Sequence, residues 1–203
     1  MHRLIAGYRQ FRRTYYPENR DMFDQLAQGQ APKTMVICCC DSRIDPALIF
    51  NARPGEMFTL RNVANLVPPF SPDGSHHSTS AAIEFAVCAL AVEHIVIMGH
   101  GRCGGVKALL GSYEGEFIGP WMRIAEPARA TALAKAGDAG ADELQRICEL
   151  EVLRISLANL SQFSWVRQKV ETGRLTLHAC YFDIERGALS VLDPRSNEFV
   201  ALD

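Results

Sequence analysis

Two short segments of this chain concentrate the residue types that bind metal ions and hold protons. One is Cys39-Cys40-Asp41-Ser42-Arg43, and the other is His100-Gly101-Arg102-Cys103. On an extended backbone alternate residues point the same way, so Cys39, Asp41 and Arg43 are expected to project together. His100 and Cys103 stand three apart at a glycine-rich turn and can converge on one ion. Two thiolates and one imidazole suit Zn²⁺, and we predict one zinc ion per chain, bound by Cys39, His100 and Cys103.

The predicted ligand set leaves the fourth tetrahedral position of zinc open. Catalytic zinc sites keep a water molecule there, whereas structural sites are normally closed by four side chains. Asp41 is the residue placed to close the site, but a bidentate contact with Arg43 would keep its carboxylate ionised and away from the metal. We therefore predict that Asp41 and Arg43 form a catalytic pair in which Asp41 orients the nucleophile. An ordinary salt bridge at the end of a strand is the alternative.

Short apolar runs bounded by turn residues predict the strands that position both segments. Residues 35–39, 57–60 and 95–98 form three such runs, and a helix is expected over residues 81–92. Strand, helix, strand is the repeating unit of a parallel sheet, in which ligands bind outside the carboxyl ends of the strands. Each of the two reactive segments follows a predicted strand, so we expect both to face one crevice.

The whole sequence predicts an α/β fold, with a central, mostly parallel β-sheet flanked by helices, an N-terminal helical arm and a C-terminal strand hairpin. Further helices are expected over residues 104–110 and 142–160. Residues 175–181 and 189–193 are expected to pair as the hairpin.

The beginning of the chain is rich in arginine and apolar at helical spacing, with no acid before residue 18. We interpret it as a docking helix that packs on the body or on a second subunit; an organelle transit peptide is the alternative. We expect residues 1–203 to form one domain, with a helical arm over 1–30 and a zinc-binding α/β core over 31–203.

Composition narrows the possible partners and the compartment. The chain has 21 Lys and Arg against 23 Asp and Glu, a net charge of −2. This balance argues against binding to nucleic acid or to a membrane surface and favours a small-molecule substrate. No apolar run approaches the roughly 20 residues that a membrane-spanning helix needs. The seven cysteines are an odd number with no secretory leader before them, so we expect a reduced, cytoplasmic protein.

The two reactive segments, taken together, resemble those of the β-class carbonic anhydrases. The resemblance extends over nearly the whole chain and is strongest in Cys39-x-Asp41-Ser42-Arg43 and His100-x-x-Cys103. It implies zinc on Cys39, His100 and Cys103, and reversible hydration of CO₂ to bicarbonate and a proton by attack of zinc-bound hydroxide. It also implies a homodimer or higher homo-oligomer, with the arm laid across the partner and the active site at the interface.

The same resemblance implies a substrate pocket. Gln30 would hydrogen-bond the substrate, while Phe58 and Val63 would form the apolar wall around CO₂. Phe85 is placed in the same substrate pocket, but plant-type relatives carry a tyrosine at this position, so the hydroxyl contact to bicarbonate is not expected here.

Family members differ in whether the aspartate can close onto zinc. The closing group resembles a pattern with Trp and Gly at the positions of Val36 and Cys38, and only its arginine, at Arg61, is present here. We therefore predict the open form. Two thiolates acidify metal-bound water less than three imidazoles do, so activity is expected to rise toward alkaline pH.

Two other functions remain as alternatives. One is a hydrolase acting on CS₂ or a related small heteroallene with the same zinc ligands. The other is a non-enzymatic structural or redox-sensing zinc site.

Overall fold

The computed structural model describes residues 1–111 and 115–202 and divides the chain into two compact units, Met1–Ala31 and Pro32–Asp203. The first unit is the expected helical arm, with α1 (His2–Arg13), α2 (Tyr15–Glu18) and α3 (Arg20–Leu26). Aromatic rings of Phe11, Tyr15, Tyr16 and Phe23 pack within the arm, with centroids 5.0 to 6.2 Å apart. These contacts hold its helices to one another.

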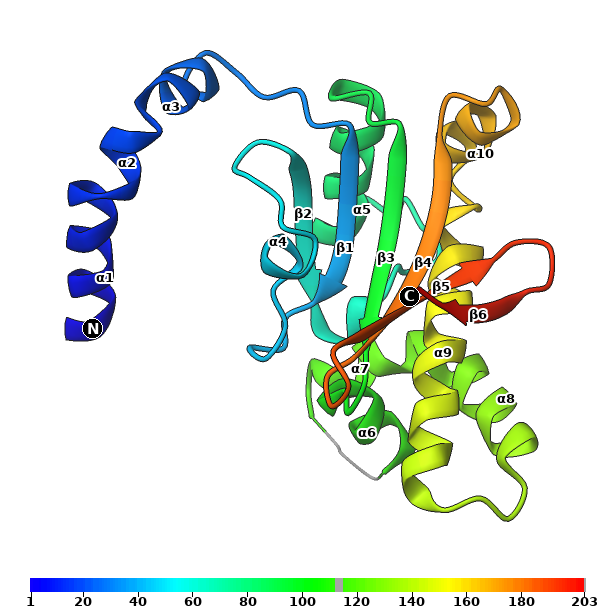
Figure 1. Ribbon diagram of the computed structural model, residues 1–203. Coiled ribbons are helices and arrows are strands. Elements are labelled where there is room, and N and C mark those ends of the chain that lie inside the picture. The colour runs from blue at the N-terminus through cyan, green and yellow to red at the C-terminus, as the bar shows by residue number, and fades with distance from the viewer. Residues whose placement is uncertain (112–114, 203) are drawn as a thin grey trace. The chain divides into compact units, whose positions relative to one another are not determined.

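The second unit, here called the core, is built on a six-stranded sheet in the order β2-β1-β3-β4-β5-β6 (Figure 1). Strands β1, β2, β3 and β4 run parallel, and β5 and β6 complete the sheet antiparallel. The expected hairpin is β4 followed by β5, so the predicted fold class is confirmed. The short β6 was not predicted. The strands are β1 (Thr34–Cys39), β2 (Met57–Asn62), β3 (His94–His100), β4 (Thr176–Asp183), β5 (Ala188–Asp193) and β6 (Glu198–Ala201).

Helices cover the two faces of the sheet unequally (Figure 1). Met35 and Ile37 of β1 point to the face that packs on α5 (Ser78–Glu84), α9 (Ala141–Leu160) and α10 (Ser164–Glu171). Val36 and Cys38 point to the other face, where α4 (Pro46–Ile49) lies. Burial on both faces explains why β1 is a continuous apolar run rather than an alternating one.

Three more helices, α6 (Gly104–Leu110), α7 (Ile118–Met122) and α8 (Glu126–Ala136), pack with α9 around a second apolar cluster. This cluster contains Cys39 and Cys103. Among the described residues, no helix is both long and apolar enough to cross a membrane.

The helix predicted over residues 81–92 is shorter than expected. Helix α5 ends at Glu84, and a π-helical turn, Phe85–Ala89, replaces its last part. Ala91 then adopts a left-handed φ of 52°, which ends the helical path before β3.

The carboxyl ends of β1 and β3 adjoin at one edge of the sheet. The two strands are parallel neighbours, paired from Thr34↔His94 to Cys38↔Met98. Beyond this last pair, β1 ends one residue later at Cys39, and β3 ends two residues later at His100. The two segments therefore lie at the same edge of the sheet, next to each other, as the strand pattern predicts.

Candidate metal centre

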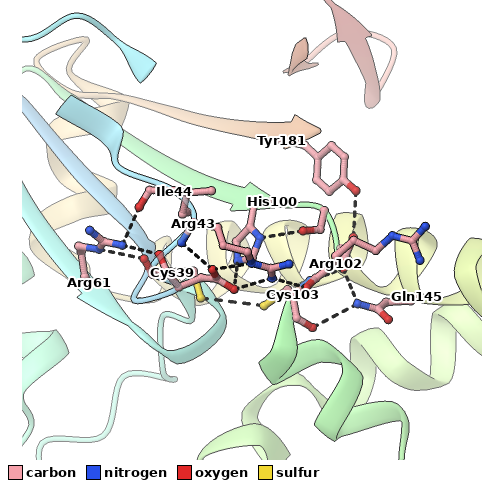
Figure 2. A network of polar contacts seen from close by, with 12 residues as sticks. Cys39, Arg43, Ile44, Arg61, His100, Arg102, Cys103, Gln145 and Tyr181 are labelled. Carbon is pink, nitrogen blue, oxygen red and sulfur yellow. Dashed lines mark hydrogen bonds and ion pairs between the residues drawn. The ribbon is translucent and has the colours of Figure 1, made fainter. Parts of the chain in front are cut away.

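Cys39, His100 and Cys103 bring three ligand atoms together at this edge of the sheet. All three side chains are buried, and one ligand atom from each lies within 4.8 Å of the others. The two Sγ atoms are 4.0 Å apart. Tetrahedral zinc with Zn–S bonds of about 2.3 Å would place two sulfurs roughly 3.8 Å apart. Figure 2 shows the two sulfurs side by side next to the imidazole.

The His100 ring is held in the form that a metal ligand requires. Its Nδ1 lies 2.9 Å from the carbonyl oxygen of Gly101, and because a carbonyl can only accept, Nδ1 carries the proton. Nε2 is then a lone-pair acceptor, and it is buried with no hydrogen-bond partner among the described residues. A buried nitrogen without a partner is costly unless it has a ligand, so the arrangement fits a metal ion on Nε2.

The two adjoining thiols ionise unequally: the pKa of Cys39 is lowered, whereas the hydrogen bond to Cys39 and burial raise the pKa of Cys103. The N–H groups of Asp41 and Ala64 donate to Cys39, and those of Gly105 and Val106 donate to Cys103. Hydrogen bonding by the Cys103 thiol, together with these donors, lowers the pKa of Cys39 below that of an ordinary thiol. Cys39 is therefore the thiolate of the pair, and zinc binding would release the remaining proton from Cys103.

Asp41 and Arg43 form the predicted pair. Arg43 Nε and Nη2 donate to the two carboxylate oxygens of Asp41 at 2.9 and 2.7 Å, and the backbone N–H of Arg43 adds a contact of 2.9 Å. These hydrogen bonds hold the pKa of Asp41 well below its usual range. Asp41 Oδ2 lies 3.9 Å from His100 Nε2, so the carboxylate borders the metal site while Arg43 restrains it. This is the arrangement expected of the open form.

Arg61 fixes the loop that carries Asp41. Its guanidinium donates to the backbone carbonyls of Cys39, Asp41 and Ile44 at 2.8 to 3.0 Å (Figure 2). Arg43 adds a bond of 2.8 Å to the carbonyl of Arg102, which joins this loop to the turn that carries His100 and Cys103. Arg61 therefore holds the first metal-binding segment in shape, and Arg43 connects it to the second.

Two side chains of α9 hydrogen-bond the backbone of Cys103, a contact that the sequence did not predict. The buried Glu149 accepts a hydrogen bond of 2.8 Å from the backbone N–H of Cys103, and Gln145 donates to the same carboxylate at 2.9 Å. Tyr181 of β4 donates to the other carboxylate oxygen at 2.9 Å. The leucine spacing of this helix predicted core packing only. The polar residues 145 and 149 lie one helical turn apart on the same face, and this was the feature of the sequence that could have indicated a polar contact.

The predicted pocket residues fall into separate places. Val63 follows β2 beside the metal ligands, in the cluster that contains Cys39 and Cys103. Phe58 and Phe85 pack on each other, with centroids 5.9 Å apart, but Phe58 lies four positions before the end of β2, roughly 13 Å along the strand. Gln30 is exposed and belongs to the arm. The roles of these four residues remain predictions.

Comparisons with known proteins agree with this centre. A family model described as carbonic anhydrase matches residues 34–189. A carbonic anhydrase of Synechococcus elongatus is 35% identical over 207 aligned positions, covering 100% of this chain and 75% of that protein.

Solved structures extend the agreement to the fold. The β-carbonic anhydrase CcaA superposes with a TM-score of 0.94 at 33% identity, covering 100% of this chain and 99% of that one. One of two tetrameric β-carbonic anhydrases from Sordaria macrospora gives a TM-score of 0.82 at 31% identity, covering 94% of this chain and 95% of that one. The comparisons favour CO₂ hydration over the CS₂ alternative. Because the matches run through the core and both metal-binding segments, we conclude that the chain belongs to the β-carbonic anhydrase family.

Proposed function

We propose that this chain catalyses the reversible hydration of CO₂ to bicarbonate and a proton at the Cys39–His100–Cys103 centre. The observation that carries the proposal is a buried three-ligand set bordered by a carboxylate that a guanidinium keeps ionised. When bound, zinc supplies Lewis acidity that makes a hydroxide nucleophile available near neutral pH. Three protein ligands leave room for that chemistry, whereas four would close it.

Asp41 orients the nucleophile. Its Oδ1 accepts two hydrogen bonds from Arg43, whereas Oδ2 accepts only one. A carboxylate oxygen offers about two acceptor positions, so Oδ2 keeps one free, and this oxygen is the one nearest His100 Nε2. An ionised Asp41 can only accept, so it turns the proton of the attacking hydroxyl toward itself and leaves a lone pair directed at the CO₂ carbon.

CO₂ is apolar, so its binding requires an apolar side chain beside the nucleophile. Val63 provides this apolar surface. It packs against Gly105, which lies at the start of α6, two residues after Cys103. A Cβ added at Gly105 would come within 2.8 Å of Val63 Cγ1, so only glycine lets the valine lie this close to the centre. Attack of hydroxide on CO₂ forms one C–O σ bond while the electron pair of one C=O π bond moves onto its oxygen, which gives bicarbonate. The proton comes from the water that supplies the hydroxide, and it leaves to solvent.

We propose further that the active unit is a homo-oligomer in which Phe58 and Phe85 complete the pocket of a second copy. Within one chain Phe58 packs on a different apolar cluster from the one that contains Cys39 and Cys103, and Phe85 packs on Phe58. Phe85 is nevertheless 48% exposed, as a contact residue would be before assembly. The tetrameric relatives from Sordaria macrospora support an assembly of this kind.

A mixing experiment tests the shared pocket. Phe85→Asp should impair the pocket and His100→Ala should remove the metal, so each variant alone should be inactive. If the pocket is shared, mixed assemblies combine an intact metal centre with an intact Phe85 from the other copy and recover activity. No recovery in assemblies shown to be mixed would refute the shared pocket.

The cytoplasm, or another reducing compartment, is the proposed location. All seven cysteines are free thiols, and two of them must remain so to bind zinc. Fractionation of cells that produce the protein would test this, and recovery with secreted proteins would refute it.

Stopped-flow measurement of CO₂ hydration tests the function itself. We expect activity in the zinc-loaded protein, loss of activity after chelation and recovery when zinc is restored. A zinc-loaded protein that hydrates no CO₂ would contradict the proposal, and it would favour the non-enzymatic alternative.

A further inference from the structure

Glu149 is a buried carboxylate that contacts the metal centre only through the protein backbone. It is 4% exposed and lies in the middle of α9. Oε1 accepts from the N–H of Cys103 and from Gln145 Nε2, and Oε2 accepts from the hydroxyl of Tyr181. Gln145 also donates to the carbonyl of Cys103 at 3.2 Å. Two side chains of α9 therefore hydrogen-bond both the N–H and the carbonyl oxygen of Cys103, one of the metal ligands.

The turn at Cys103 needs such an anchor. Arg102 adopts a left-handed φ of 59°, and Cys103 precedes the first residue of α6 in an extended conformation. Its N–H therefore points out of the helix, and without Glu149 this buried donor would have no partner. The direction of this N–H and the direction of the Sγ are set by the same backbone, so fixing one restricts the other.

A buried carboxylate at position 149 carries a desolvation cost that a side chain with only a packing role would not need. Burying a carboxylate costs free energy unless its hydrogen bonds are satisfied; an apolar side chain would avoid this desolvation but would leave the Cys103 N–H and the Tyr181 hydroxyl without their acceptor. Glu149 instead makes three contacts, one of them to the backbone of a metal ligand. Partners behind metal ligands orient them, and their loss typically reduces metal affinity or activity about 10 to 100-fold.

We propose that Glu149 is a positioning residue that holds the Cys103 sulfur in place for the metal ion. The inference rests on the proposed zinc-dependent function. The carboxylate acts through its hydrogen bonds and its reach from α9, and it does not touch the substrate.

Two single substitutions of Glu149 separate the effect of its side-chain length from the effect of its negative charge. Glu149→Gln keeps the length: its carbonyl can accept from Cys103 and Gln145, and its amide can donate to the Tyr181 oxygen. Glu149→Asp keeps the charge but is one methylene shorter, so it cannot span from Cys103 to Tyr181. If positioning is the role, the glutamine variant keeps the site and the aspartate variant loses it; if negative charge is the role, the order reverses.

Glu151, on the same helix, provides a matched control. It is 8% exposed and pairs with Lys135 of α8 at 2.8 Å and with Arg154 at 3.3 Å, away from the turn at Cys103. Glu151→Gln and Glu151→Asp therefore disturb a buried glutamate of α9 without touching a metal ligand. These two variants therefore show how much a general destabilisation of α9 changes the rate of zinc release.

The measurement is the rate at which zinc-loaded protein releases its metal to a chromophoric chelator, alongside the melting temperature. We expect Glu149→Asp to accelerate release about 10 to 100-fold. Glu149→Gln and both Glu151 variants should release zinc at the wild-type rate. Equal rates for Glu149→Asp and wild type, or equal acceleration by Glu149→Asp and Glu151→Asp, would overturn the proposal.

Two further results keep the test decisive. If Glu149→Asp does not fold, the half-buried Gln145 provides a second variant, and Gln145→Ala should also accelerate release; release at the wild-type rate would refute the positioning role. Failure of the proposed function looks different, because wild-type protein would then bind zinc without hydrating CO₂.

Discussion

Replacing Arg43 with alanine should separate metal binding from turnover. The substitution removes the two side-chain hydrogen bonds to Asp41, at 2.9 and 2.7 Å, and the bond of 2.8 Å to the carbonyl of Arg102. It touches none of the three ligands. Asp41 then loses the partner that holds it beside the site, and its carboxylate, 3.9 Å from His100 Nε2, is free to enter the ligand set.

The expected size of the effect follows from the exposure of the pair. The Arg43 side chain is 49% exposed, so solvent screens its ion pair, and we expect a stability loss of about 1 kcal/mol. For a domain of this size that corresponds to a melting temperature lower by roughly 2–4 °C. Misorientation of the nucleophile by about 1 Å can cost about 100-fold, so kcat/KM should fall by about that factor.

The pH dependence of the stability loss has a defined sign. Arg43 depresses the pKa of Asp41 below the ordinary value of 3.8, so the pair stabilises the folded state above that pH. The contribution is lost only as the pH falls through the depressed pKa. The difference in melting temperature between wild type and Arg43→Ala should therefore be constant from about pH 6 to pH 8.

Zinc content by mass spectrometry and stopped-flow CO₂ hydration on the same preparation test the prediction. We expect one zinc per chain in both proteins and a large loss of turnover in the variant. A variant that loses zinc would show that Arg43 supports metal binding itself. A variant with unchanged kcat/KM would refute the orienting role of the pair.

Three other predictions follow from the site. Asp41→Ala should retain zinc while kcat/KM falls about 100-fold, measured by the same two methods; loss of zinc would identify Asp41 as a ligand. Gly105→Ala should lower the free energy of unfolding by about 1–3 kcal/mol in urea denaturation, because its Cβ would meet Val63 and Ala64 at 2.8 and 3.0 Å; unchanged stability would contradict this packing. The stopped-flow kcat/KM of the wild type should rise toward alkaline pH, because two thiolates offset the charge of the metal; a plateau reached by about pH 6 would contradict that reasoning.

The metal ligands could be predicted from sequence because local pattern and topology agree there. Residues 35–39 and 95–98 are apolar on both strand faces, so they had to be buried strands, and parallel neighbours end at the same edge. The residues just beyond those ends, Asp41 and His100, were thereby placed in one crevice.

Other features depend on contacts that leave no local trace. Glu149 meets Cys103 across 46 positions of sequence, and nothing in the leucine pattern around it shows what its carboxylate accepts. Strand β6 has only four residues and follows a polar turn, so it exists through its pairing with β5. The π-helical turn after α5 contains Ala86 and Val87, which pack in the core, and none of its five residues is a glycine or proline that would mark a break in the sequence.

X-ray absorption at the zinc edge of the zinc-loaded protein tests the central claim most directly, because it counts the atoms bound to the metal. The structure predicts two sulfur neighbours at about 2.3 Å, from Cys39 and Cys103, and two lighter neighbours at about 2.0–2.1 Å, of which only the His100 nitrogen belongs to the protein. Replacing His100 with alanine should remove the metal. Three or four sulfur neighbours, or zinc that remains bound without His100, would contradict the account.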